Sequence, residues 1–361
     1  MLQSKTLFIV GAGASFELGL PVGDELKVDI ARLLDIRFPD GWQQKSGDYQ
    51  ITEVLRSIAR NDETLRGDIN PFLHQAWRIR DALPTAISID NLLDAHRGDR
   101  LIETCGKLGI AKAILEAERK SKISDLGRVG REYSLSNLAA TWYIPLFQMM
   151  TENVRKNDVA QVADRLSFII FNYDRCLEHF IPHGLSIYYG ISRPEAEEIT
   201  ARMTFIHPYG QVGYLPWQGR KPALEFGTDR YPLHDIAQEI KTFAEGLRTP
   251  KLVDEIREAV QEAEAVVFMG FAYHPINMQV IATKAELTRK IFGTTYGLSK
   301  ADEKVVKDDI LRVLNKRDPR FPALPMHEPN VAEELDALEL ESLTCADFLR
   351  QYFRSIGARP E

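Results

Sequence analysis

The sequence predicts an α/β fold: a Rossmann-like parallel sheet with flanking helices and a large helical insertion. Four short apolar runs have the length of buried parallel strands, and they cover residues 6–10, 166–171, 203–206 and 265–269. The segments between them carry apolar residues at helical spacing. Strands separated by helical segments favour a largely parallel sheet.

The helical segments follow from spacing and composition. After the first strand, Leu26, Ile30, Leu33 and Leu34 fall on one face of a helix. Between residues 36 and 160 charged and apolar residues mix at helical spacing, and residues 110–119 are almost all good helix formers.

We therefore expect residues 1–35 and 160–300 to form a nucleotide-binding core, with residues 36–159 as a helical insertion. Residues 301–361 are expected to form a C-terminal helical extension. A long helical pattern also covers residues 234–263. In the tail, charged and amphipathic helices at 300–314 and 345–353 flank a proline-containing stretch, residues 318–325.

Composition restricts the function classes. The chain has 361 residues and a formal net charge of −7, which argues against a broad electrostatic surface for nucleic acid. No apolar run reaches the roughly 20 residues of a membrane helix, and the N-terminal apolar run is too short for a signal peptide. We expect a cytoplasmic protein that neither enters a membrane nor binds nucleic acid directly. The three cysteines lie far apart and predict no metal site.

In open α/β sheets, ligands bind at the carboxyl ends of the strands. It is therefore informative that each predicted strand is followed by glycine, polar or ionisable residues. In chain order these segments are Gly11-Ala-Gly-Ala-Ser15, Asn172-Tyr-Asp174, His207-Pro-Tyr-Gly210 and Gly270-Phe-Ala-Tyr-His-Pro275. If the strands are parallel neighbours, all four segments meet at one edge.

The first segment suits a phosphate. Gly11 permits a tight turn, Gly13 lets the backbone approach a pyrophosphate, and Ser15 adds a hydroxyl donor. The alternative is that these small residues only pack a strand against a helix. A dehydrogenase is disfavoured, because the third glycine of its fingerprint would fall at Phe16.

The other three segments each allow two interpretations. Asn172 and Asp174 point to the same side of an extended chain, although they could simply form an Asx turn. His207 could act as a base near neutral pH or serve only in packing. Gly270 could allow close approach of a ligand or form a turn.

Together these segments resemble the divergent sirtuin-like domain of prokaryotic antiviral defence proteins. Gly11–Ser15 with Gly19-Leu-Pro21 resembles its NAD loop, and Phe171–Glu178 resembles its Asn-Tyr-Asp segment. His207 with Gly210 is similar to the sirtuin His-Gly, and Gly270-Phe-Ala to the late nucleotide loop. Ser88-Ile-Asp-Asn-Leu-Leu93 resembles another short segment of this branch.

The resemblance implies that the chain hydrolyses NAD to nicotinamide and ADP-ribose, as an abortive-infection effector that drains NAD from the cell. Asn172 would orient the ribose or the water, His207 would accept a proton, and Asp174 would engage the nicotinamide carboxamide. The binding residues implied are Gly11, Ala12, Gly13, Ser15, Pro21 and Asp90, with Gly270 and Phe271 on the adenosine side.

Departures from the family pattern argue against a protein deacylase. Three isolated cysteines cannot build the deacylases' zinc ribbon, and Val22-Gly-Asp-Glu25 replaces their Asp-Phe-Arg. A non-catalytic sensor of NAD or ADP-ribose remains the main alternative, and a structural subunit is a third. Because an NAD hydrolase must be restrained, we also expect a homo-oligomer or an assembly with a defence partner, such as an ATPase or a phage protein.

Overall fold

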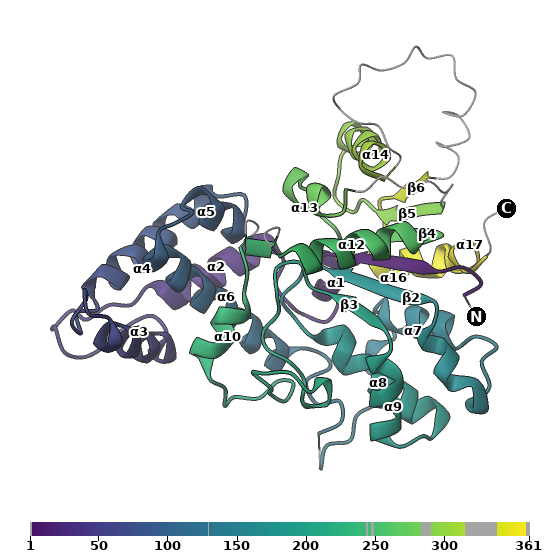
Figure 1. The fold of residues 1–361 in the computed structure, drawn as a ribbon, viewed down its shortest axis with the longest axis horizontal. Helices are drawn as coiled ribbons and strands as arrows, with labels where there is room; N and C mark the ends of the chain where they lie inside the picture. Colours follow the sequence, from purple (N-terminus) through teal and green to yellow (C-terminus); the bar gives the residue numbers. More distant parts are fainter. Residues whose placement is uncertain are drawn as a thin grey trace.

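The computed structural model describes residues 2–128, 130–242, 245–246, 249–282, 290–314 and 338–358. Its centre is a six-stranded, all-parallel sheet in the order β3-β2-β1-β4-β5-β6, flanked by helices (Figure 1). This confirms the predicted Rossmann-like fold. The strands are β1 (Thr6–Val10), β2 (Leu166–Ile170), β3 (Thr204–Ile206), β4 (Ala265–Met269), β5 (Lys290–Thr294) and β6 (Leu338–Glu341).

The first four strands coincide with the predicted apolar runs, whereas β5 and β6 were not expected. Strand β6 alternates leucine with glutamate, so only every second residue is apolar. It pairs in parallel with β5. The helical extension expected over residues 301–361 therefore contains helices at 300–314, 345–351 and 353–357 and, in addition, an edge strand that was not expected. The proline-containing stretch, residues 318–325, lies outside the described residues.

The sheet divides the core into two apolar clusters, because successive side chains of a strand point to opposite faces. In β1, Leu7 and Ile9 belong to one cluster, whereas Phe8 and Val10 belong to the other. All four side chains are buried. A central strand that is apolar on both faces requires cover on both faces, and the helices provide it.

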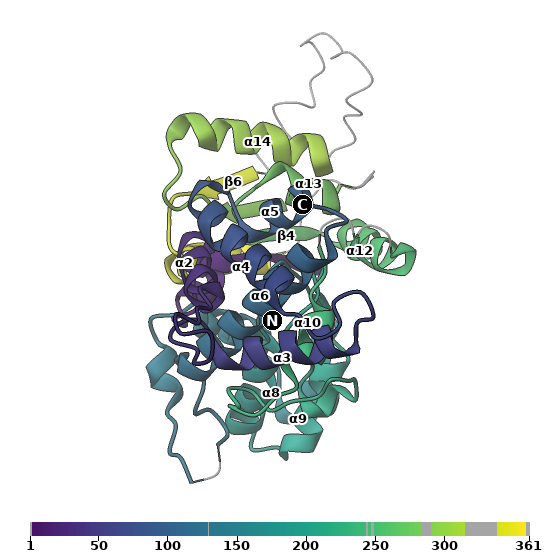
Figure 2. The ribbon, with the colours of Figure 1, turned by 90° about the vertical axis from the view of Figure 1, so that its left-hand side faces the viewer.

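The predicted insertion contributes to both clusters. Its first part packs with the cluster of Leu7 and Ile9, and its last part packs with the cluster of Phe8. Figure 1 shows the first part to the left of the sheet and Figure 2 looks onto it. The first part and the helix before it comprise α2 (Gly23–Leu34), α3 (Tyr49–Asn61), α4 (Asn70–Ala82), α5 (Ile89–Ala95) and α6 (Arg100–Lys120).

The opposite face is covered mainly by helices from the middle and from the C-terminal end of the chain. They are α7 (Tyr143–Thr151), α8 (Cys176–Tyr189), α9 (Arg193–Ala201), α16 (Cys345–Gln351) and α17 (Phe353–Gly357). The amphipathic segment predicted at 345–353 therefore packs on its own protein: Phe348 and Leu349 are fully buried. No helix among the described residues is long and apolar enough to cross a membrane.

The long helical pattern at 234–263 does not form one helix. Helix α10 covers Leu233–Glu239 and α12 covers Pro250–Glu262. Pro250 begins the second helix, where its missing N–H is not needed. Two further helices, α13 (Pro275–Val280) and α14 (Lys300–Leu314), lie beside each other near β5 and β6.

Candidate functional site

A cavity of about 400 Å³ lies at the carboxyl ends of the strands. This volume falls in the range of small-molecule sites. Residues that follow β1, β2, β3 and β4 all contribute to its wall, and α2 and α5 complete it. The wall contains eight residues predicted from the sequence, namely Gly11, Ala12, Ser15, Pro21, Asp90, Asn172, Asp174 and Phe271.

A chain of hydrogen bonds joins the segment after β1 to the segment after β2. The Asn172 amide donates to the Ser15 hydroxyl at 2.9 Å, and that hydroxyl donates to Asp174 Oδ2 at 2.8 Å. The backbone N–H of Cys176 donates to Asp174 Oδ1 at 3.2 Å. All three polar side chains are buried, so the wall is pre-organised before any ligand enters.

The orientation of the Asn172 amide follows from its partners. Its Nδ2 lies 3.0 Å from the backbone carbonyl oxygen of Gly11, which can only accept a hydrogen bond. Both amide hydrogens are therefore directed at Gly11 and Ser15. The Oδ1 atom, which has no hydrogen-bond partner in the described parts of the chain, is left as an acceptor for a ligand hydroxyl or a water molecule.

The glycines bring two strand ends into close contact. A Cβ at Gly11 would lie 2.5 Å from the Gly270 carbonyl oxygen, and one at Gly13 would lie 2.9 Å from Gly270 Cα. The Gly13 N–H donates to the Gly270 carbonyl, and Gly270 itself has a positive φ of 56°. Any side chain at these positions would separate β1 from β4.

Two residues that were predicted to contact the phosphates or the nucleotide do not line the cavity. Neither Gly13 nor Gly270 reaches the cavity wall. Their backbone groups bond to each other, and the Gly270 N–H donates to Thr294 Oγ1 at 2.9 Å. Gly13 therefore fits the alternative interpretation of the loop, in which small residues only pack a strand against its neighbours. The cavity wall at this point is formed by Gly11, Ala12 and Ser15.

His207 also lies elsewhere than expected. It is absent from the cavity wall, and its side chain is only 7% exposed. Its Nδ1 lies 3.1 Å from the backbone carbonyl of Asn172, and its Nε2 lies 2.8 Å from Glu178 Oε1 on α8. Since the carbonyl can only accept, Nδ1 carries a proton, and Nε2 shares one with the carboxylate. The prediction that His207 faces the substrate as a free base does not fit this geometry.

Burial lowers the pKa of His207, but the charge and hydrogen bond of Glu178 outweigh it, so that the net shift is upward. The pair therefore favours the imidazolium form. It contacts the Asn172 backbone through His207 and contributes nothing to the cavity wall.

Asp90 lies on the opposite wall, in a short helix of the insertion. The Ser88 hydroxyl caps this helix by accepting from the Asn91 N–H at 3.0 Å. The Tyr173 hydroxyl donates a hydrogen bond to Asp90 Oδ1. Burial raises the pKa of Asp90, more than the Tyr173 hydrogen bond lowers it. Tyr173 lies between Asn172 and Asp174 in the sequence. The segment after β2 therefore lines the cavity and also contacts α5 through the Tyr173 hydroxyl.

Several wall residues were not singled out from the sequence, and they include Asp94, Tyr209, His274 and Asn277. Asp94 lies four residues after Asp90, and so on the same helix face. Tyr209 stands two residues after His207, and its hydroxyl donates to Asn277 Oδ1 at 2.6 Å. The sequence carried a signal for Tyr209 and His274, since both lie in the strand-end segments.

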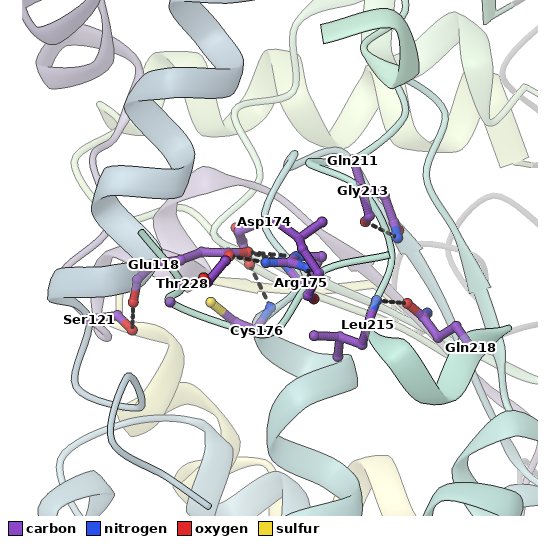
Figure 3. Close-up of polar contacts among 12 residues, drawn as sticks. Glu118, Ser121, Asp174, Arg175, Cys176, Gln211, Gly213, Leu215, Gln218 and Thr228 are labelled. Carbon is purple, nitrogen blue, oxygen red and sulfur yellow. Dashed lines mark hydrogen bonds and ion pairs between the residues drawn. The ribbon is translucent and has the colours of Figure 1, made fainter. Parts of the chain in front are cut away.

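A buried ion pair fastens the insertion to the site. Arg175 and Glu118 are fully buried, and Figure 3 shows them side by side. The Arg175 Nη2 lies 2.5 Å from Glu118 Oε2, and its Nη1 donates to the Leu224 carbonyl at 3.0 Å. Glu118 also accepts from the Arg175 N–H at 2.9 Å. The end of α6 thus holds the backbone directly after Asp174.

In comparisons with known proteins, no family model and no curated protein matches this sequence. The functional argument therefore depends on the cavity itself. Within the described residues, no group of three or more His, Cys, Asp or Glu side chains is arranged to hold a metal ion.

Proposed function

We propose that this chain is an NAD glycohydrolase that cleaves NAD to nicotinamide and ADP-ribose, and that it belongs to the divergent sirtuin-like branch of antiviral defence proteins. In that role it would drain NAD from an infected cell. One observation carries the proposal: the Asn172 amide is fixed by Gly11 and Ser15, its Oδ1 has no partner among the described residues, and Asn172 lines a cavity of about 400 Å³.

In the proposed reaction, the bond between ribose C1′ and the nicotinamide nitrogen breaks, and nicotinamide leaves with the electron pair. Water adds its oxygen to C1′ and releases one proton. Asn172 Oδ1 orients the ribose or this water. Asp174, linked to Asn172 through Ser15, is the carboxylate of the same hydrogen-bonded chain and accepts the proton. Ala12 and Gly11 lie where the pyrophosphate passes β1.

His207 acts through Asn172 in this proposal and is a positioning residue. Its bond to the Asn172 carbonyl fixes the backbone from which the amide projects. A displacement of about 1 Å in a positioned group can reduce turnover by roughly 100-fold. Loss of turnover on mutation of His207 is therefore expected, for a different reason than loss of a base.

A variant pair tests these roles. Asn172→Ala should reduce nicotinamide release by about 100-fold or more, while the exposed Asn137→Ala serves as the matched control and should retain the wild-type rate. The reaction is followed chromatographically. If Asn172→Ala released nicotinamide at the control rate, the assignment of Asn172 would be wrong.

A non-catalytic sensor of NAD or ADP-ribose is the second candidate, and the engagement of both His207 nitrogens favours it. A sensor would need the cavity but no group that accepts a proton. Tight binding of NAD without release of nicotinamide would identify the sensor.

A further inference from the structure

Arg175 joins three segments that lie far apart in the sequence. It follows Asp174 directly and immediately precedes α8. Its guanidinium donates to both carboxylate oxygens of Glu118, at 3.2 and 2.5 Å, and to the Leu224 carbonyl at 3.0 Å. Glu118 belongs to α6, in the insertion, and Leu224 lies in the loop between β3 and α10. The segment after β2 is thus held by two other parts of the chain, at a point that is fully buried.

Glu118 also fixes the backbone of this segment. Its Oε1 accepts from the Arg175 N–H at 2.9 Å, and the next N–H, of Cys176, donates to Asp174 Oδ1 at 3.2 Å (Figure 3). The other oxygen of Asp174 belongs to the hydrogen-bonded chain of the cavity wall. Consecutive contacts therefore connect the end of the insertion to the wall.

Filling the interior does not require this ion pair. Taking two charges out of water is costly, and apolar side chains of similar volume often give equal or greater stability. An apolar side chain cannot accept a hydrogen bond from a backbone N–H, however, whereas Glu118 does. Neither Glu118 nor Arg175 lines the cavity. Both side chains therefore act on the site through the backbone that follows Asp174.

We propose that Glu118 and Arg175 are positioning residues for the proposed hydrolysis, through which the insertion holds the segment after β2 in its active geometry. The inference rests on the proposed function, because it concerns the same reaction, and it makes the insertion a part of the catalytic unit. A displacement of about 1 Å in a positioned group can reduce turnover by roughly 100-fold. The effect is therefore expected in kcat more than in the binding of NAD.

A double variant separates positioning from stability. Glu118→Leu, Arg175→Met replaces the pair by apolar side chains and leaves no unpaired charge, so the melting temperature should stay close to that of the wild-type protein. Nicotinamide release should nevertheless show a kcat at least about tenfold lower, with KM changed by less than about threefold. The matched control is Arg193→Met, Glu197→Leu, which removes a half-buried pair on α9 and should retain the wild-type kcat.

Glu118→Asp is the second variant, and it carries the test if the double variant does not fold. It keeps the charge opposite Arg175 but shortens the side chain by one methylene, so that the carboxylate no longer reaches the backbone N–H and the guanidinium together. Its kcat should also fall at least about tenfold. Hydrogen–deuterium exchange gives a readout without substrate: the amides of residues 171–178 should exchange faster in both variants and at the wild-type rate in the control.

The possible failures are distinguishable. If the wild-type protein releases nicotinamide and the folded double variant retains its kcat, the inference is overturned and the proposed function stands; the same result for Glu118→Asp decides the matter where the double variant does not fold. Unchanged exchange over residues 171–178 would also overturn the inference alone. A wild-type protein that releases no nicotinamide would overturn both.

Discussion

The segment after β2 and the segment after β3 look alike in sequence, since each places a polar side chain within two residues of the end of a strand. In the structure they differ. Asn172 lies at the cavity wall, whereas His207 lies behind it and donates to the Asn172 backbone. Tyr209, two residues further on, takes the place at the wall that we expected for His207. The end of a strand thus predicts the edge of the sheet, but the loop decides which side chain faces the ligand.

The strand order explains this difference. Strand β2 pairs with β1, so Asn172 meets the loop after β1, and its amide binds Gly11 and Ser15. Strand β3 stands at the edge of the sheet, next to β2 only. His207, after β3, therefore meets the segment after β2, where its Nδ1 bonds to the Asn172 carbonyl, and Tyr209 lines the cavity two residues later.

The largest effect on stability should come from His207→Ala. The substitution leaves the buried carboxylate of Glu178 without its partner, and removing one member of a buried pair costs about 3–5 kcal/mol. Glu178 Oε2 already has no partner among the described residues, so the charge cannot be satisfied elsewhere. Chemical denaturation measures the loss.

The double variant His207→Ala, Glu178→Gln sharpens the comparison between the two segments. Because it removes the unpaired charge, it should be more stable than His207→Ala alone. If His207→Ala changed the free energy of unfolding by less than about 0.5 kcal/mol, the buried pair with Glu178 would not stabilise the fold and the comparison would fail.

A smaller effect is expected from Gly13→Ala. Its Cβ would lie 2.9 Å from Gly270 Cα and 3.0 Å from the Gly270 carbonyl oxygen, both in backbone that cannot easily move. Overpacking of this kind costs about 1–3 kcal/mol, measured by thermal or chemical denaturation. Gly23→Ala is the matched control, because nothing lies within 4 Å of its Cβ position. Equal stabilities of the two variants would show that β1 and β4 do not need this contact.

The smallest effect should be a pH dependence of stability. The pKa of His207 is raised in the folded protein, so its contribution is fully present below the unfolded pKa of about 6.5. It is lost as the pH rises through the higher folded value. Wild-type protein should therefore lose stability relative to His207→Gln as the pH increases above about 6.5. A stability difference that stays constant with pH would argue against an imidazolium–carboxylate pair.

The sequence predicted much of the fold because the central strands are apolar on both faces. Strands β1, β2 and β4 are runs of this kind, whereas β3 is a short edge strand with an exposed Thr204. The four strand-end segments meet because these strands are parallel neighbours. Strands β5 and β6 escaped prediction for physical reasons: β5 begins with Lys290 and contains Gly293, and β6 alternates leucine with glutamate. Edge strands with one polar face give a weak signal.

The site was predicted less completely than the fold. The small and polar residues that line the cavity after β1 and β2 were found, because glycine, serine, asparagine and aspartate are informative residue types there, whereas Tyr173 was not. Nothing in the sequence could show that Gly13 and Gly270 bond to each other, or that Glu178 would engage His207, since both contacts join residues brought together only by folding.

The central claim is that the cavity cleaves NAD, and the most direct test is the product balance of the full-length chain. Purified protein at high concentration is incubated with NAD, and nicotinamide, ADP-ribose and remaining NAD are quantified over time. We expect nicotinamide and ADP-ribose to appear in equal amounts as NAD disappears, and Asn172→Ala to abolish both. NAD that binds and stays intact would contradict hydrolysis and identify the chain as a nucleotide sensor.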